Sequence, residues 1–264
     1  MGKLTEQQRL FKRLNERFVR AFVTYKLLAD DDHVLVGLSG GKDSLLLTEL
    51  LAKRSRIDHP RFRVEALHVR MENVRYKTST DYLQQFCDEL GVPLHLVTTS
   101  FDSNDSSQPN NPSQPNDSSL FTLPSSLKKK PACFLCSWYR RKQFFNIAQE
   151  LGCNKIALGH HRDDIIRTAL MNLTFQGRFD AMPANLQMRK MPLTIIRPLC
   201  LIDEADISRY AELSHYEKQL KQCPYEHETN RTAIEEVFQT MQRINPEARF
   251  SIWRAIEAAG KLTG

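Results

Sequence analysis

The periodicity of apolar residues changes along this chain. Between Thr5 and Leu28, apolar residues recur at helical spacing with basic residues between them, which predicts an amphipathic helix packed on a core. From residue 32 onward, short apolar runs alternate with helical patterns. The runs predict strands at 34–38, 62–69, 94–98, 155–158 and 193–196, and the patterns predict helices at 43–54, 78–90, 137–151 and 163–173.

This alternation favours right-handed βαβ units. We therefore expect an α/β fold, a Rossmann-like parallel sheet with helices on both faces and ligands at the carboxyl ends of the strands. Three further helices are expected at 203–213, 232–243 and 250–259. The expected organisation is an N-terminal amphipathic helix at 1–29, an α/β domain at 30–200 and a C-terminal helical extension at 201–264.

A polar stretch interrupts the pattern. Residues 100–126 are dominated by Ser, Asn, Asp, Gln and Pro and contain almost no core-forming residue before Leu120. Such a segment buries too little surface to offset its ordering entropy, so we expect a disordered loop at about 102–126. Lys128, Lys129 and Lys130 follow it, and a solvated charge run is the favoured interpretation over an arm that closes on a polyanion.

The composition narrows the classes of protein. The 264 residues include 37 Lys and Arg against 31 Asp and Glu, and the resulting charge of +6 suits a polyanionic partner. The first 20 residues contain no long apolar run, so we expect no signal peptide, no membrane span and a cytoplasmic protein. In that reducing compartment the six cysteines are expected to be metal ligands, catalytic thiols or core residues rather than disulfides.

The run from Val34 to Ser44 joins a predicted strand to a predicted helix through a glycine-rich turn. Gly40 and Gly41 permit close approach of the backbone, and the helix start presents N–H groups to an anion. The sequence Ser39-Gly-Gly-Lys-Asp-Ser44 lacks the glycine spacing of a P-loop but resembles the SGGxDS pyrophosphate-binding loop of the ATP pyrophosphatase superfamily. Nucleotide binding is favoured over an ordinary strand–turn–helix junction.

A second motif, Gly159-His-His-Arg-Asp-Asp164, follows the predicted strand at 155–158 and opens a helix. Its side chains are therefore expected at the same edge of the sheet as the phosphate loop. Asp163 or Asp164 would hold Mg²⁺ on the phosphates, and His160 would contact a phosphate or a substrate oxygen. The alternative is that Asp163 only caps the helix and His160 is packed.

Two cysteines stand three residues apart at the start of a predicted helix. The helix N-terminus and the basic residues after Cys133 and Cys136 favour the thiolate form. Cys223 is the natural third member, because it lies in a loop beside a proline rather than on a helical core face. Three thiolates would leave one metal position open, as a working site requires. Zinc, redox chemistry and an iron–sulfur cluster all remain compatible with this set. The other cysteines, Cys87, Cys153 and Cys200, are interpreted as buried or incidental.

Together these motifs, with Ile196-Arg-Pro-Leu199, resemble the tRNA 2-thiocytidine biosynthesis family over roughly residues 5–243. The resemblance implies an adenylating tRNA thiolase, with a PP-loop ATP pyrophosphatase domain at 30–200, that uses ATP and Mg²⁺ and carries a [4Fe-4S] cluster. It assigns the cluster to Cys133, Cys136 and Cys223. It also implies cytidine at tRNA position 32 as substrate, sulfur from a cysteine desulfurase or inorganic sulfide, and a possible homodimer. Two departures from the family pattern are the polar insertion at 103–119 and the lack of a second cysteine after Cys223.

In the mechanism that we expect, AMP is attached to the C2 oxygen of cytidine and sulfur then displaces it. Lys42 stabilises the developing charge, Asp43 or Asp163 positions Mg²⁺, and Cys223 takes part in sulfur delivery. The pyrophosphate and its surroundings are bound by Ser39, Gly40, Gly41, Ser44, Gly159 and His160. The alternatives are a thiolase of another tRNA base that uses a persulfide or disulfide, an amidotransferase or ligase for a small molecule, and a sensor without turnover.

Overall fold

The computed structural model describes residues 4–72, 74–76, 79–100, 132–189, 191–217, 219, 221–222 and 230–263. The polar stretch expected to be disordered, the three lysines after it and Cys223 lie outside the described residues. The expected disorder therefore stays a prediction.

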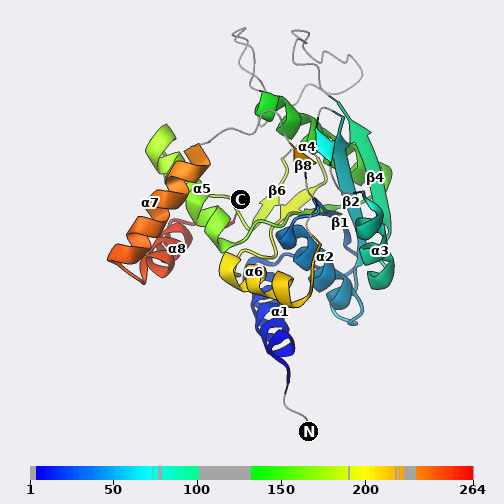
Figure 1. Ribbon diagram of the computed structural model, residues 1–264, viewed down its shortest axis with the longest axis horizontal. Helices are drawn as coiled ribbons and strands as arrows, with labels where there is room; N and C mark the ends of the chain where they lie inside the picture. Colours follow the sequence, from blue (N-terminus) through cyan, green and yellow to red (C-terminus); the bar gives the residue numbers. More distant parts are fainter. Residues whose placement is uncertain are drawn as a thin grey trace.

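The architecture is built on one six-stranded sheet, seen in Figure 1. Five strands are parallel and the sixth, at one edge, is antiparallel. Their order is β4 (Leu94–Thr99), β2 (Arg63–Met71), β1 (His33–Gly37), β5 (Lys155–Ala157), β7 (Thr194–Ile196) and β6 (Asn185–Gln187). The central strand β1 pairs Val34 with Val64 on one side and with Lys155 on the other. Val34, Leu35 and Val36 are fully buried, as expected for a parallel strand covered on both faces.

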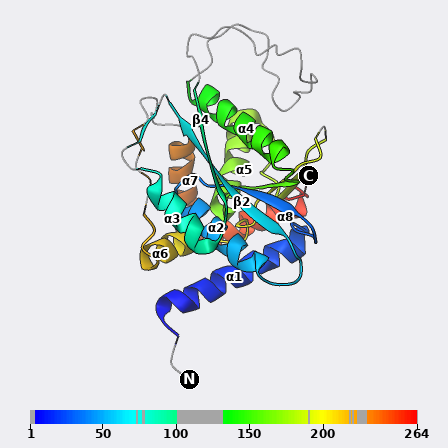
Figure 2. The same ribbon diagram turned by 90° about the vertical axis from the view of Figure 1, so that its right-hand side faces the viewer.

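Helices cover both faces of the sheet. Figure 2 shows α2 (Lys42–Ser55) and α3 (Asp81–Leu90) on one side of β2 and α4 (Ala132–Glu150) on the other. The core agrees with this view, because Leu46 of α2 and Leu35 of β1 belong to different buried clusters. The predicted fold class, a Rossmann-like sheet with helices on both faces, is confirmed.

The N-terminal helix α1 (Glu6–Tyr25) begins with a capping box at Thr5 and packs Leu14 and Phe18 fully buried against the larger cluster. Arg17 of α1 donates to Asp203 at 3.0 Å and to Asp206 at 2.8 Å at the start of α6 (Glu204–Leu213). The helix is therefore amphipathic, as predicted.

The C-terminal part is helical. The helix α5 (Arg162–Gln176) packs beside α7 (Asn230–Ile244) and α8 (Ala248–Ala258), and Phe238 of α7 joins the same large core as α1 and α2. The proposed boundaries of the three segments stay a prediction. No helix in the described ranges is long and apolar enough to cross a membrane.

Three features differ from the sequence-based expectation. The edge strand β6 and a small antiparallel pair, β3 (Arg75–Tyr76) with β8 (Lys221–Gln222), were not predicted, because two or three residues are too few to show a period. The helix expected from residue 137 instead includes residues from Ala132 onward. Its early turns pack Ala132, Leu135 and Tyr139 on Met71 and Val74, a contact that no local pattern shows.

Candidate nucleotide site and the adjoining cysteines

The turn between β1 and α2 forms the phosphate loop. Ser44 holds this turn closed, because its hydroxyl donates to the carbonyl of Gly41 at 2.8 Å and accepts from the N–H of Ser39 at 3.1 Å. Gly41 is the N-cap of α2 and carries no side chain to cap the helix. The first N–H groups of α2 are therefore open to an anion at the positive end of the helix dipole.

Two glycines let other segments touch this loop. Gly40 has φ +79°, and a Cβ placed there would lie 2.7 Å from the Cβ of Gln219. The N–H of Gln219 donates to the carbonyl of Gly40 at 3.2 Å. A Cβ on Gly159 would lie 3.2 Å from the backbone carbon of Asp43. Gly40 therefore requires glycine for steric and conformational reasons, and Gly159 leaves little room for a side chain. The phosphate loop lies in close contact with Gln219 and with the β5–α5 turn.

A cavity of about 550 Å³ opens beside the phosphate loop at the carboxyl ends of the strands. Most of the predicted nucleotide-binding residues line it, namely Ser39, Gly41, Asp43, Ser44, Gly159, His160 and Asp164. Further lining residues that the sequence did not single out for this cavity are His68, Tyr76, Arg140, Phe144, His161, Arg167, Glu204 and Gln219. The two motifs predicted to meet at this edge thus do so.

Three of the predicted nucleotide-site residues, Gly40, Lys42 and Asp163, are not among the lining residues. The ammonium of Lys42 lies 3.1 Å from Glu204 and 3.4 Å from Asp43. Burial alone lowers the pKa of Lys42, but the charges of Asp43 and Glu204 outweigh burial and raise the pKa above its ordinary value. Lys42 is therefore protonated and already paired with carboxylates.

Asp163, in the first turn of α5, is buried against the start of α6. Its carboxylate accepts the N–H of Glu204 at 2.8 Å and lies 3.0 Å from the guanidinium of Arg249. Asp164, the next residue, lines the cavity instead, because consecutive residues of an α-helix point roughly 100° apart around its axis. The structure thus brings Asp164 but not Asp163 to the cavity.

The buried side chain of His161 lies near three carboxylates at the cavity wall. The Nε2 atom of His161 lies 3.3 Å from Asp164, 3.8 Å from Asp43 and 4.0 Å from Glu204. Burial raises the pKa of Glu204, but hydrogen bonds from Lys42 and Arg167 more than offset it and lower the pKa to about 2. Glu204 is therefore ionised. Within the described ranges, no group of three or more His, Cys, Asp or Glu side chains is arranged to hold a metal ion.

The far wall of the cavity is aromatic. The Nδ1–H of His68 donates to the carbonyl of Leu38 at 2.7 Å, and the ring lies 6.5 Å from that of Tyr76. Burial lowers the pKa of His68 below its ordinary value; the bond to Leu38 acts in the opposite direction, and the charges of Arg140 and Arg70 lower it further. His68 is therefore neutral, and its ring meets the ring of Tyr76 edge to face in a wall whose aromatic surface suits a planar base.

The helix with the two predicted thiols adjoins this wall. Cys136 is half-buried in the small cluster around Met71 and Val74, and Cys133 is exposed one turn earlier on α4. Arg140, four residues after Cys136 and so about 6 Å further along the helix, lines the cavity and donates to the hydroxyl of Tyr76 at 3.1 Å. The thiol-bearing turn is therefore next to the cavity.

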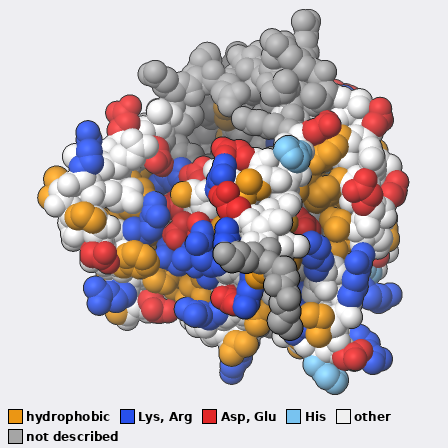
Figure 3. Space-filling model, turned by 60° about the horizontal axis from the view of Figure 1, so that its bottom comes forward, with side chains coloured by type: hydrophobic (Ala, Val, Ile, Leu, Met, Phe, Trp, Pro, Cys, Tyr) orange, Lys and Arg blue, Asp and Glu red, His pale blue; other side chains and the backbone are white. Residues whose placement is uncertain are grey.

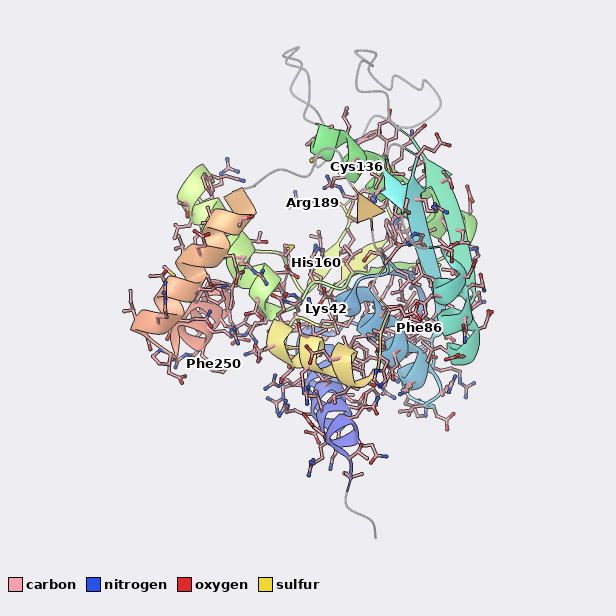
Figure 4. All side chains as sticks on the ribbon, in the orientation of Figure 1. Lys42, Phe86, Cys136, His160, Arg189 and Phe250 are labelled. Carbon is pink, nitrogen blue, oxygen red and sulfur yellow. The ribbon has the colours of Figure 1, made fainter. Side chains whose placement is uncertain are left out.

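The third predicted cysteine lies outside the described residues, but the residue before it does not. Gln222 of β8 pairs with Arg75 of β3, beside Tyr76. In Figure 4, Cys136, His160 and Lys42 follow one another down the centre of the view, whereas Phe86 and Phe250 lie to either side. Cys87, Cys153 and Cys200 are buried, as the sequence predicted.

The parallel sheet, the phosphate loop and the cavity at the strand ends define a nucleotide-binding α/β protein of the PP-loop class. A family model described as a PP-loop domain matches residues 7–116. The chain is 31% identical over 252 residues to the tRNA-cytidine(32) 2-sulfurtransferase of Bordetella avium, covering 95% of this chain and 74% of that protein. It is 30% identical to the protein of the same name from Pseudomonas fluorescens strain Pf0-1, covering 97% of this chain and 88% of that protein.

Among solved structures, the U34-tRNA thiolase from Methanococcus maripaludis with its [4Fe-4S] cluster superposes with a TM-score of 0.70. The superposition covers 96% of this chain and 79% of that chain, and the two are 23% identical, so the likeness supports the fold. The identity and coverage of the sequence relatives go further. The chain belongs to the tRNA-cytidine(32) 2-sulfurtransferase family, and the resemblance stated from the motifs is confirmed.

Gly40→Ala is predicted to weaken ATP binding by roughly tenfold or more, because the added methyl group displaces Gln219 from the phosphate loop. Gly152→Ala is the matched control: Gly152 has a similar φ of +68° but no atom within 4 Å of the added Cβ. Both variants are expected to lose about 1–2 kcal/mol of stability from the left-handed backbone. Calorimetric titration with ATP tests the difference, and equal binding by the two variants would contradict the steric argument.

His68→Asn is predicted to reduce the loss of stability on acidification. Because the folded pKa of His68 lies below the unfolded value of about 6.5, its contribution is complete above that pH and declines as the pH falls below it. Asparagine keeps an N–H donor but does not titrate. Urea unfolding at pH 7.5 and pH 5.5 measures the effect, with His59→Asn as control because the His59 side chain is 88% exposed. A pH dependence as steep as that of the wild type in His68→Asn would disprove the assignment.

Proposed function

We propose that this protein is an ATP-dependent sulfurtransferase that converts the cytidine at tRNA position 32 into 2-thiocytidine. Two relatives with this printed name match nearly the whole chain. The observation that carries the proposal is the contact between the two halves of the site: Arg140 lines the nucleotide cavity and lies on the same helix as Cys133 and Cys136.

The nucleotide half suits adenylation. The C2 oxygen of cytidine attacks the α-phosphorus of ATP, a new P–O bond forms, and the bond to the pyrophosphate breaks. The open N–H groups of α2, with Ser39 and Ser44, bind the leaving pyrophosphate, and Lys42 balances its growing negative charge. The aromatic wall of His68, Tyr76 and Phe144 accommodates a base. Gly159 and His160 also line the cavity.

Mg²⁺ is proposed to bind between the phosphates and the carboxylates that face them. Asp43 and Asp164 line the cavity, and carboxylate oxygens are the ligands that this ion prefers. Asp163 is engaged with the N–H of Glu204 and with Arg249, so it contributes by orienting α6 rather than by direct contact. Phosphate oxygens would supply the ligands that the described side chains lack.

The sulfur half is proposed to hold a [4Fe-4S] cluster through Cys133, Cys136 and Cys223. The first two fit this role, because residues at i and i+3 of a helix share one face and soft thiolates are the usual ligands of such clusters. When bound, the cluster would present sulfur at a fixed place beside the activated base. A new C–S bond at C2 then forms as the bond to the adenylated oxygen breaks and AMP leaves. We propose a cysteine desulfurase or inorganic sulfide as the source of that sulfur.

The partner and the location follow from the proposed substrate. The anticodon loop of tRNA would approach the cavity from the strand ends, held by dispersed lysines and arginines. The face in Figure 3 carries Lys and Arg side chains interspersed with Asp and Glu rather than a continuous basic surface. We propose the cytoplasm as the location, because tRNA modification takes place there, and a homodimer as a means to extend the contact surface.

Alanine variants of Cys133, Cys136 and Cys223 are predicted to abolish 2-thiocytidine while ATP affinity stays within about twofold of the wild type, because thiols and phosphate loop serve separate steps. Mass spectrometry of tRNA nucleosides from a complemented deletion strain measures the product, and iron and acid-labile sulfide assays on anaerobic protein measure the cluster. Cys153→Ala is the matched control, since burial raises the pKa of that thiol to about 11 and keeps it unreactive. Full thiolation by any of the first three variants removes that residue from the site, and an active, iron-free protein would favour the persulfide route.

A further inference from the structure

Arg167 lies five residues after the first residue of α5, and its side chain reaches the phosphate end of the cavity. Its side chain is 12% exposed and lines the cavity. The guanidinium is held at three points: Nε donates to the carbonyl of Asp163 at 3.1 Å, Nη1 lies 2.8 Å from Glu235 of α7, and Nη2 donates to Glu204 at 2.6 Å. Side chains on a helix lean toward its N-terminus, which directs this one toward the phosphate loop. Arg167 is thus a fixed planar cation at the cavity wall.

Glu204 joins this cation to the lysine of the phosphate loop. One carboxylate oxygen lies 3.1 Å from Lys42 and the other 2.6 Å from Arg167. Glu204 is the first residue of α6, where the N–H that it donates to Asp163 fixes its backbone. Its side chain is 39% exposed and lines the same cavity. A single carboxylate therefore contacts both cations at the edge where the phosphates are expected.

A bound phosphate could replace only one of the three contacts of Arg167. The hydrogen bond to the carbonyl of Asp163 and the ion pair with Glu235 hold the guanidinium on the side away from the cavity, since neither partner lines it. The bond to Glu204 is on the cavity side. A pyrophosphate offers several oxygens and more charge than one carboxylate, and a guanidinium binds phosphate oxygens through parallel N–H bonds. Exchange of Glu204 for phosphate therefore leaves Arg167 oriented.

We propose that Arg167 is a phosphate-contacting residue that acts with Lys42 on the pyrophosphate portion of ATP, and that Glu204 is a positioning residue that holds both cations until phosphate replaces it. The inference rests on nucleotide binding in the proposed function but not on the identity of the acceptor. A merely structural role of this network predicts loss of stability without any preference between ligands. The proposed role predicts selective effects on ligands that carry a pyrophosphate.

Isothermal titration of the full chain with inorganic pyrophosphate, ATP and adenosine, without tRNA, tests the proposal. Arg167→Gln is expected to weaken the binding of pyrophosphate and of ATP about tenfold or more and to leave the affinity for adenosine within about twofold of the wild type. Glu204→Gln is expected to tighten the binding of pyrophosphate in the absence of Mg²⁺ about threefold or more, because it removes the negative charge that competes with phosphate for Lys42 and Arg167. Arg209→Gln is the matched control, since Arg209 is ion-paired with Glu6 and Glu212 on the exposed part of α6, and it should change nothing.

Arg167→Lys, which keeps the charge but loses the planar fork, guards against a folding defect and is expected to bind pyrophosphate with intermediate affinity. Wild-type pyrophosphate affinity in Arg167→Gln, an equal loss for adenosine, or weaker pyrophosphate binding in Glu204→Gln would overturn the proposal. Failure of the proposed function is distinguishable. If the wild-type protein forms no 2-thiocytidine but the variants show this phosphate selectivity, the inference stands and the proposed function fails. If the wild-type protein forms 2-thiocytidine but Arg167→Gln binds pyrophosphate as tightly as the wild type, the inference fails and the proposed function stands.

Discussion

The site depends on the close approach of backbone segments around the phosphate loop. Gly40 leaves no room for a side chain between the loop and Gln219, and Gly159 leaves little between the β5–α5 turn and the first turn of α2. These segments are far apart in the sequence, and they meet because β5 pairs with β1 and the strand ends share one edge. The order of the strands in the sheet therefore determines which segments form the phosphate end of the cavity.

Charge pairing sets the second constraint. The carboxylates of Asp43, Asp164 and Glu204 line the cavity. Lys42 and Arg167 are both paired with Glu204, and Lys42 is also paired with Asp43. Half-buried charges of this kind are stable only when each has a partner, since desolvation is costly. The cations beside the phosphate loop therefore have acidic partners within the protein. Glu204, which is ionised and lines the cavity, is a partner of both.

The small elements connect the nucleotide cavity to the cysteines. The hydroxyl of Tyr76 accepts from the N–H of Met71 and from Arg140 of α4, so the two-residue strand β3 joins the end of β2 to the helix that carries Cys133 and Cys136. The partner strand β8 ends at Gln222, and the segment before it contacts Gly40 through Gln219. These contacts link the phosphate loop to β8, and β3 to the helix that carries Cys133 and Cys136.

Much of this protein was determined by sequence alone. The alternation of short apolar runs with helical patterns predicts the five parallel strands, because a strand buried on both faces of a sheet is apolar throughout, whereas a helix shows a period of 3.6 residues. The loop Ser39–Ser44 and the motif Gly159–Asp164 predict the nucleotide site, because strand ends carry ligands in such sheets. Only the tertiary structure decided that Asp164 rather than Asp163 faces the cavity, since Asp163 is taken up by α6 and Arg249. The roles of Glu204, Arg167 and Gln219 likewise come from contacts between residues distant in the chain, and such contacts leave no local period from which they could be predicted.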